Sequence, residues 1–124
     1  MARILLIDDD NAFRTVLGLT LTHFGHAVVE ARNGREGLEL FLDASADLLI
    51  TDLVMPEKEG IEVLIALRDR LPPVNIIAMS GGGLGKAETY LRSATLLGAA
   101  RVLKKPFSNE ALLAAVNELL ADGK

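Results

Sequence analysis

Short apolar runs separated by polar stretches recur along the chain and predict an alternating α/β fold. The runs are too short for helices, and continuous apolar character of this kind is typical of strands buried on both faces of a parallel sheet. The predicted strands cover residues 3–8, 27–31, 48–50, 74–79 and 101–103. The second run is the least apolar, so we expect that strand near an edge of the sheet.

Each predicted strand is followed by a stretch with helical spacing. The first apolar stripe comprises Phe13, Val16, Leu17, Leu21 and Phe24, and Gly25 ends that helix as a C-terminal cap. A turn at Asn33–Gly34 precedes the second helix, and further helices are predicted over residues 59–71, around residues 90–97, and after Ser108, which caps the last one. This alternation of five strands with five helices indicates βαβ units with right-handed crossovers in one sheet.

The composition is that of one soluble domain, which we expect to span residues 1–124. Half of the residues are apolar, and the formal charge of -4 argues against direct binding to nucleic acid or to an anionic membrane surface. No cysteine is present, which excludes disulfides and thiolate metal sites. Neither a membrane span nor a signal peptide is recognisable, so we expect a cytoplasmic protein.

Polar residues stand at the ends of four predicted strands. Asp8 and Asp9 follow the first, Asp52 the third, Ser80 the fourth and Lys105 the fifth. Because the carboxyl ends of parallel strands share one edge of the sheet, these side chains are predicted to converge there. Clustered carboxylates favour a divalent cation, and oxygen ligands suit Mg²⁺. A lysine and a hydroxyl beside such a carboxylate form a phosphoryl-binding set, in which the carboxylate is the nucleophile.

Other polar residues have structural explanations. Asp10 is predicted to be an N-terminal helix cap or first-turn residue. His23 and His26 have no neighbour at metal-ligand spacing and are predicted to lie at the surface or its boundary. Taken singly, Asp52 and Ser80 also fit turn residues, and Lys105 fits a solvated charge. The case for a site therefore depends on the whole set.

Over its whole length the chain resembles the response-regulator receiver domains of two-component signalling, including the chemotaxis receivers. The resemblance is carried by I-L-L-I-D-D-D, by T-D-L-V-M-P-E-K-E-G, by Ser80 and by K-K-P-F. It implies a flavodoxin-like sheet with strand order 2-1-3-4-5 and a phosphoryl group transferred to Asp52 from a histidine kinase or phosphotransfer protein. The implied roles are phosphoryl transfer for Asp52, Ser80 and Lys105, and Mg²⁺ binding for Asp8, Asp9, Asp52 and the main-chain carbonyl of Val54.

Two features depart from the usual receiver pattern. Val102 stands where receivers usually carry an aromatic residue, and residues 81–85 are rich in glycine. Two alternatives stay open. One is a degenerate receiver that docks partners without being phosphorylated. The other is an aspartate-based phosphohydrolase, although Asn11 and Ala12 break the D-x-D-x-T pattern that Asp8 and Asp10 begin.

Overall fold

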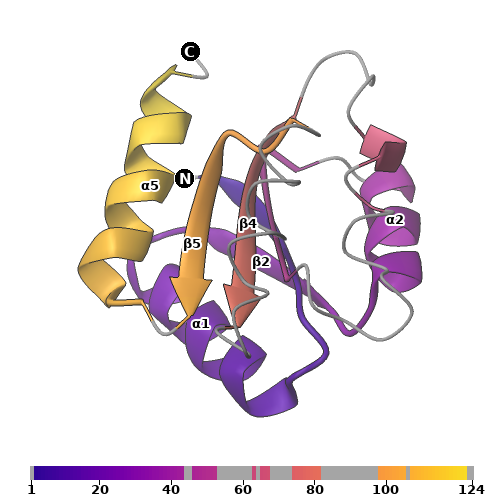
Figure 1. Cartoon of the computed structure of the whole chain (residues 1–124), viewed down its shortest axis with the longest axis horizontal. Helices are drawn as coiled ribbons and strands as arrows, with labels where there is room; N and C mark the ends of the chain where they lie inside the picture. Colours follow the sequence, from indigo (N-terminus) through magenta and orange to yellow (C-terminus); the bar gives the residue numbers. More distant parts are fainter. Residues whose placement is uncertain are drawn as a thin grey trace.

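A five-stranded parallel sheet forms the centre of the protein in the computed structural model (Figure 1). The structure describes residues 2–43, 46–52, 63, 65–67, 74–81, 98–105 and 107–122. The strands are β1 (Arg3–Ile7), β2 (Ala27–Ala31), β3 (Leu48–Asp52), β4 (Asn75–Gly81) and β5 (Arg101–Lys105). Their order is β2-β1-β3-β4-β5, and all neighbouring pairs are parallel. The predicted sheet and its order are confirmed, with β2 at an edge.

Helices cover both faces of this sheet. α1 (Asn11–His23) and α5 (Asn109–Asp122) lie on one face, and α2 (Gly34–Asp43) lies on the other (Figure 1). Val63 and residues 65–67 are helical, within the range predicted for the third helix. The remainder of that range and the predicted helix around residues 90–97 lie outside the described residues.

The core consists of two apolar layers, one on each face of the sheet. In β1, Leu5 and Ile7 pack in the layer beneath α2, whereas Ile4 and Leu6 pack beneath α1 and α5. Successive side chains of a strand point to opposite faces of the sheet. A central strand that is covered on both faces must therefore be apolar at its odd and its even positions. Each fully buried side chain of this size contributes roughly 1.5–3 kcal/mol. The continuous apolar runs therefore place β1 and β3 in the interior.

The ends of α1 follow the sequence prediction, as do Leu17 and Leu21 of the predicted stripe, but two other residues of that stripe do not. Asp10 is the N-cap, accepting a hydrogen bond from the Phe13 amide at 3.0 Å, and Gly25 follows the helix with φ of 92°. Val16 and Phe24, predicted to be buried, are 64% and 55% exposed. The buried residues of α1 are Arg14, Leu17, Gly18 and Leu21. The prediction was wrong because it counted apolar residues only and passed over a buried arginine and glycine.

Several element boundaries differ from the predicted ones. Gly34 is the first residue of α2 rather than part of a turn, and Asn33 caps the helix by accepting from the Glu36 amide at 2.8 Å. β4 continues through Ser80 to Gly81, and β5 continues to Lys105. Pairing between the two strands extends their carboxyl ends, because Ser80 pairs with Lys104 and Gly81 pairs with Lys105. The predicted cap of α5 is confirmed, since the Ser108 hydroxyl accepts from the Ala111 amide at 3.0 Å.

α2 approaches β1 closely at Gly37. A Cβ atom at this position would lie 2.2 Å from Cδ1 of Ile7, far inside van der Waals contact. The absence of a side chain at Gly37 therefore allows α2 to pack closely against β1, the strand that leads to Asp8. Within the described ranges, none of the helices has the length and apolar character needed to span a bilayer.

Candidate functional site

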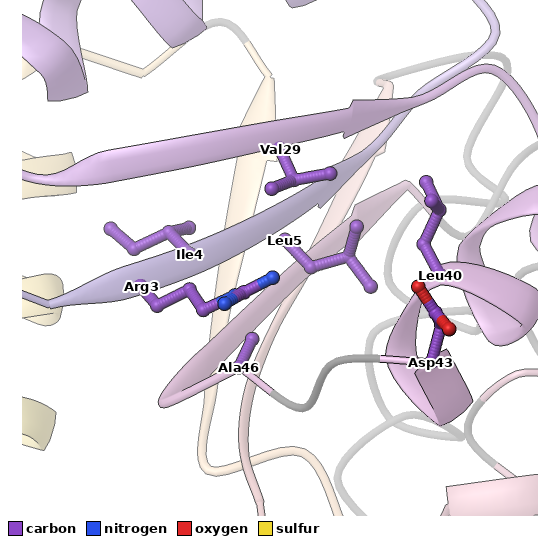
Figure 2. Close-up of a pocket in the computed structure, with 7 residues that line it drawn as sticks. All are labelled: Arg3, Ile4, Leu5, Val29, Leu40, Asp43 and Ala46. Carbon is purple, nitrogen blue, oxygen red and sulfur yellow. The ribbon is translucent and has the colours of Figure 1, made fainter.

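A small cavity lies near the amino ends of the strands, between β1, β2 and α2 (Figure 2). Leu5, Val29 and Leu40 form its apolar lining, with the charged side chains of Arg3 and Asp43 at its border. Its volume is about 50 Å³. None of the predicted site residues lines this cavity, so the predicted chemistry lies elsewhere in the structure.

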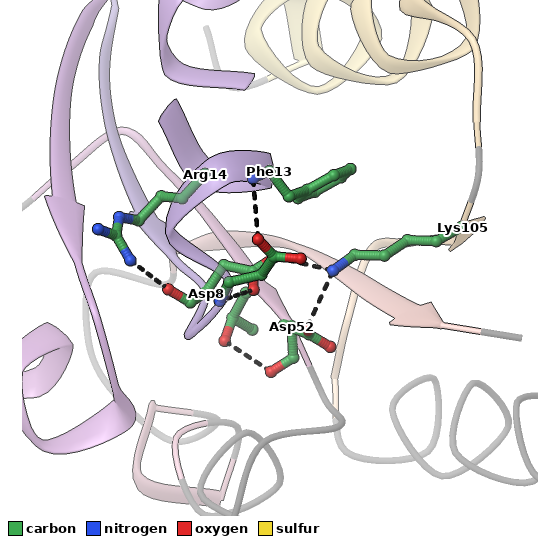
Figure 3. Close-up of polar contacts among 7 residues, drawn as sticks. Asp8, Phe13, Arg14, Asp52 and Lys105 are labelled. Carbon is green, nitrogen blue, oxygen red and sulfur yellow. Dashed lines mark hydrogen bonds and ion pairs between the residues drawn. The ribbon is translucent and has the colours of Figure 1, made fainter. Parts of the chain in front are cut away.

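The opposite edge of the sheet, at the carboxyl ends of the strands, carries the polar residues singled out by the sequence (Figure 3). Asp52 is the last residue of β3, Lys105 is the last of β5, and Asp8 directly follows β1. The parallel register aligns these ends, since Ile7 pairs with Thr51 and Asp52 pairs with Met79. The predicted convergence of Asp8, Asp52 and Lys105 is therefore confirmed.

Lys105 bridges the two buried carboxylates. Its Nζ donates to Oδ2 of Asp8 at 2.8 Å and to Oδ2 of Asp52 at 2.9 Å (Figure 3). The Asp8 side chain is fully buried, and those of Asp52 and Lys105 are 6% and 17% exposed. Burial of the ammonium acts against its charge, but the hydrogen bonds and charges of Asp8 and Asp52 outweigh it and raise the pKa of Lys105. The lysine is thus a permanent cation at neutral pH.

Asp8, Asp9 and Asp52 form a group that fits a metal ion. Each offers a carboxylate oxygen, and these oxygens lie within 4.8 Å of one another. Asp8 and Asp52 are buried, whereas Asp9 is exposed, so the group faces solvent on one side. Hard oxygen donors with room for retained waters suit Mg²⁺. Val54, whose carbonyl is the fourth predicted ligand, lies outside the described residues.

Every polar atom of Asp8, in its main chain and its side chain, takes part in a hydrogen bond. Its amide donates to the Ala31 carbonyl at 3.1 Å, and its carbonyl accepts from Nη1 of Arg14 at 2.7 Å. Its Oδ1 accepts from the Asp10 amide at 2.9 Å, while Oδ2 accepts from Lys105. A buried carboxylate that accepts hydrogen bonds at both oxygens keeps one orientation.

The Phe13 ring lies over the lysine, and a second ring packs against Phe13. Nζ of Lys105 lies 4.1 Å from the centroid of the Phe13 ring, within cation–π distance. Phe107 packs edge-to-face against Phe13, with their centroids 5.9 Å apart. The Phe13 ring takes space that water would otherwise fill beside the ammonium, so it favours the contacts of the ammonium with the carboxylates.

Ser80 is completely buried near the end of β4. It follows Met79, the register partner of Asp52, and pairs with Lys104 on its other side. Its predicted place at this edge of the sheet therefore holds. Thr51, also fully buried, donates through its hydroxyl to the carbonyl of Asp52 at 3.2 Å and stiffens the end of β3.

The histidines stay outside the site, as predicted. His23 is exposed and His26 is partly buried, and among the described residues neither belongs to a metal-ligand group. The sequence analysis did not predict that Arg14 and Phe13 lie next to the site. For Arg14 a signal exists: residues 14, 17, 18 and 21 follow helical spacing, so an arginine stands on the buried stripe of α1.

Comparisons with known proteins agree with this geometry. The family profile described as response regulator receiver domain matches residues 4–117. The transcriptional regulatory protein CpxR of Escherichia coli K12 is 37% identical over 121 residues, which is 97% of this chain and 50% of CpxR. The transcriptional regulatory protein GlrR of the same strain is 34% identical over 119 residues, 96% of this chain and 26% of GlrR. The chain thus spans half or less of the length of these relatives.

Solved structures show the same fold. The receiver domain of the Francisella response regulator 1452 superposes with a TM-score of 0.88 at 26% identity, covering 100% of both chains. The chemotaxis response regulator CheY4 of Vibrio cholerae superposes with a TM-score of 0.83 at 29% identity, covering 96% of this chain and 98% of that one. With its flavodoxin-like sheet and its acidic edge, the chain belongs to the response regulator receiver domain family of two-component systems.

Proposed function

We propose that Asp52 accepts a phosphoryl group from the phosphohistidine of a sensor histidine kinase or phosphotransfer protein. The observation that carries this proposal is the bridge from Lys105 to both Asp8 and Asp52. In this position the Lys105 ammonium can neutralise negative charge on a phosphoryl group bound to Asp52. Two further carboxylates, those of Asp8 and Asp9, offer oxygen donors for Mg²⁺ beside Asp52.

The proposed transfer is a displacement at phosphorus. A carboxylate oxygen of Asp52 forms a bond to the phosphorus atom, the bond from phosphorus to the donor imidazole nitrogen breaks, and its electron pair stays on that nitrogen. Bound Mg²⁺ would supply positive charge to the phosphoryl oxygens and bring the carboxylates together. Lys105 moves from the Asp52 carboxylate to a phosphoryl oxygen, and the Ser80 hydroxyl donates a hydrogen bond to another.

In this scheme the domain catalyses its own phosphorylation, because the donor supplies only the phosphoryl group. The curated relatives CpxR and GlrR are named transcriptional regulatory proteins, and this chain matches one part of each. We therefore propose that phosphorylation of Asp52 changes how the receiver contacts an output domain or a partner protein. Direct contact with nucleic acid is not part of the proposal, given the net charge of -4.

Phosphorylation by acetyl phosphate, with and without Mg²⁺, tests the proposal. We expect a Mg²⁺-dependent, acid-labile phosphoprotein that Asp52→Asn abolishes without loss of the fold. Asp43→Asn is the matched control, because Asp43 is an exposed carboxylate at the end of α2 and borders the remote cavity. Normal labelling of Asp52→Asn would refute the assignment.

The same experiment separates the two alternatives. Rapid turnover of phosphomonoesters would indicate an aspartate-based phosphohydrolase. A wild-type protein that binds Mg²⁺ but takes no phosphoryl group would indicate a degenerate docking receiver. The match to the receiver family favours neither of them.

A further inference from the structure

The buried guanidinium of Arg14 connects the end of β1, the start of α1 and strand β2, and its contact with Asp8 is drawn in Figure 3. Arg14 is 9% exposed, on the face of α1 that packs against the sheet. Its Nη1 donates to the main-chain carbonyl of Asp8 at 2.7 Å, and Nη2 donates to Oδ1 of Asn11 at 2.8 Å. Its Nε donates to Oε1 of Glu30, on edge strand β2, at 3.0 Å. Every nitrogen of the guanidinium therefore has an acceptor.

Neighbouring residues are arranged to accept this buried charge. Glu30 supplies the opposite charge from β2, and Gly18 leaves room for it, because a Cβ atom there would lie only 3.0 Å from Oε2 of Glu30. Burying a guanidinium is costly unless it is paired and fully hydrogen-bonded. Apolar side chains on the same stripe would fill this position without that cost, so the arginine points to a purpose beyond packing.

The contact with Asp8 identifies that purpose. Asp8 lies where the chain leaves β1, and its amide is fixed by Ala31 of β2 at 3.1 Å. Arg14 fixes the carbonyl of the same residue, so the peptide groups on both sides of the Asp8 side chain are held. The carbonyl of Asp8 also belongs to the peptide unit that leads into Asp9. The position of Arg14 therefore determines where the Asp8 and Asp9 carboxylates lie relative to Asp52.

We propose that Arg14 is a positioning residue for the divalent-cation site, acting through the main-chain carbonyl of Asp8 and braced by Glu30. This inference rests on the proposed function, because it takes the group Asp8, Asp9 and Asp52 as the cation site. Arg14 touches neither the cation nor the phosphoryl group in this scheme. Its effect is to reduce the freedom of two ligands before the cation arrives, as residues outside the ligand shell do in other metal sites.

A purely structural role makes a different prediction. If Arg14 only stabilised the fold, its replacement would lower the free energy of unfolding but leave the Mg²⁺ affinity of the folded protein unchanged. If Arg14 positions the ligands, the Mg²⁺ affinity of the folded protein falls as well. Calorimetric titration of the whole chain with MgCl₂, well below the melting temperature of each variant, separates the two.

The informative variant is Arg14→Lys, which keeps the charge and the aliphatic stem but cannot donate to three acceptors in the planar fork of arginine. We expect its Kd for Mg²⁺ to rise about tenfold, the lower end of the effect seen for residues that orient metal ligands. Arg101→Met is the matched control. Arg101 also pairs with a glutamate, Glu118, but at the amino end of β5, so its loss should leave the Kd unchanged.

Glu30→Gln gives a second measurement and disturbs the fold less than a change at Arg14, because the Glu30 side chain is 41% exposed. It keeps an acceptor for Nε but removes the bracing charge, and we expect a smaller rise in Kd in the same direction. Wild-type Mg²⁺ affinity in folded Arg14→Lys would overturn the inference and leave the proposed function standing. If Arg14→Lys does not fold, an unchanged Kd in Glu30→Gln overturns it. Failure of the wild-type protein to bind Mg²⁺ would overturn both proposals.

Discussion

Lys105 and Asp8 are separated by 97 positions in the sequence, yet Nζ of the lysine donates to Oδ2 of the aspartate at 2.8 Å. The same ammonium contacts Asp52 at 2.9 Å. Lysine and a divalent cation therefore stabilise the same negative charges. Removing either one should increase the dependence of the fold on the other, and the first two predictions follow from this relationship.

Magnesium should stabilise the native state. Asp8, Asp9 and Asp52 repel one another, and a ligand that binds only the folded form raises its stability by mass action, by about 2.7 kcal/mol at one hundred times Kd. Thermal melting should show a midpoint several degrees higher in millimolar Mg²⁺. Asp9→Asn should lose most of that shift, whereas Asp43→Asn should retain it. An identical midpoint with and without Mg²⁺ in the wild type would contradict the site.

Lys105→Met should destabilise the protein in the absence of Mg²⁺. The substitution leaves two buried carboxylates without their cation, and breaking a buried pair in this way costs roughly 3 kcal/mol. Addition of Mg²⁺ should recover part of the loss, so the Mg²⁺-induced shift grows. Lys104→Met is the matched control, because Lys104 is the exposed neighbour on the same strand. Equal losses in the two variants, measured by urea unfolding, would show that the bridge contributes nothing.

The stabilisation by Lys105 should persist to alkaline pH. Its pKa is raised above the ordinary 10.5 in the folded protein, so its contribution is complete below that value and declines as the pH rises through the higher folded pKa. The difference in unfolding free energy between wild type and Lys105→Met, measured without Mg²⁺, should be constant from about pH 7 to about pH 10. A decline that began near neutral pH would mean that the lysine is not held by the carboxylates.

Val102 bears on how the signal leaves the site. It is half-buried and packs against the core layer beneath α2. A β-branched residue of this size cannot carry a ring from outside to inside, as the aromatic residue usual at this position in receivers would. We therefore expect Ser80 to couple instead to the glycine-rich stretch over residues 81–85, of which residues 82–85 lie outside the described residues.

Amide hydrogen exchange with and without a beryllofluoride mimic of the phosphoryl group tests this coupling. Protection should increase over residues 81–88 in the wild type, and Ser80→Ala should lose the increase. Changes restricted to α1 and residues 53–59, with no change over residues 81–88, would mean that the glycines serve only as a connector.

The order of residues along the chain was enough to predict strands that are buried on both faces and helix caps that form between near neighbours. β1 and β3 are buried on both faces, so continuous apolar runs identified them, and Asp10, Gly25 and Ser108 cap helices through contacts with near neighbours. Which residues of α1 are buried was predicted less well. Val16 and Phe24 are exposed although apolar, while Arg14 is buried although charged. Burial of a side chain depends on partners such as Glu30, which lies on another strand.

The sequence by itself determined the alternation of the described strands and helices, where most of them begin, and the presence of aspartates, a serine and a lysine at the strand ends. Each of these depends on spacing within a few residues. Only the tertiary structure decided that Lys105 joins Asp8 to Asp52, that Phe13 lies over the lysine, and that Arg14 holds the carbonyl of Asp8. These contacts join residues of different elements. Their distances depend on the register of the parallel strands and on how α1 packs against the sheet, which spacing along the chain does not specify.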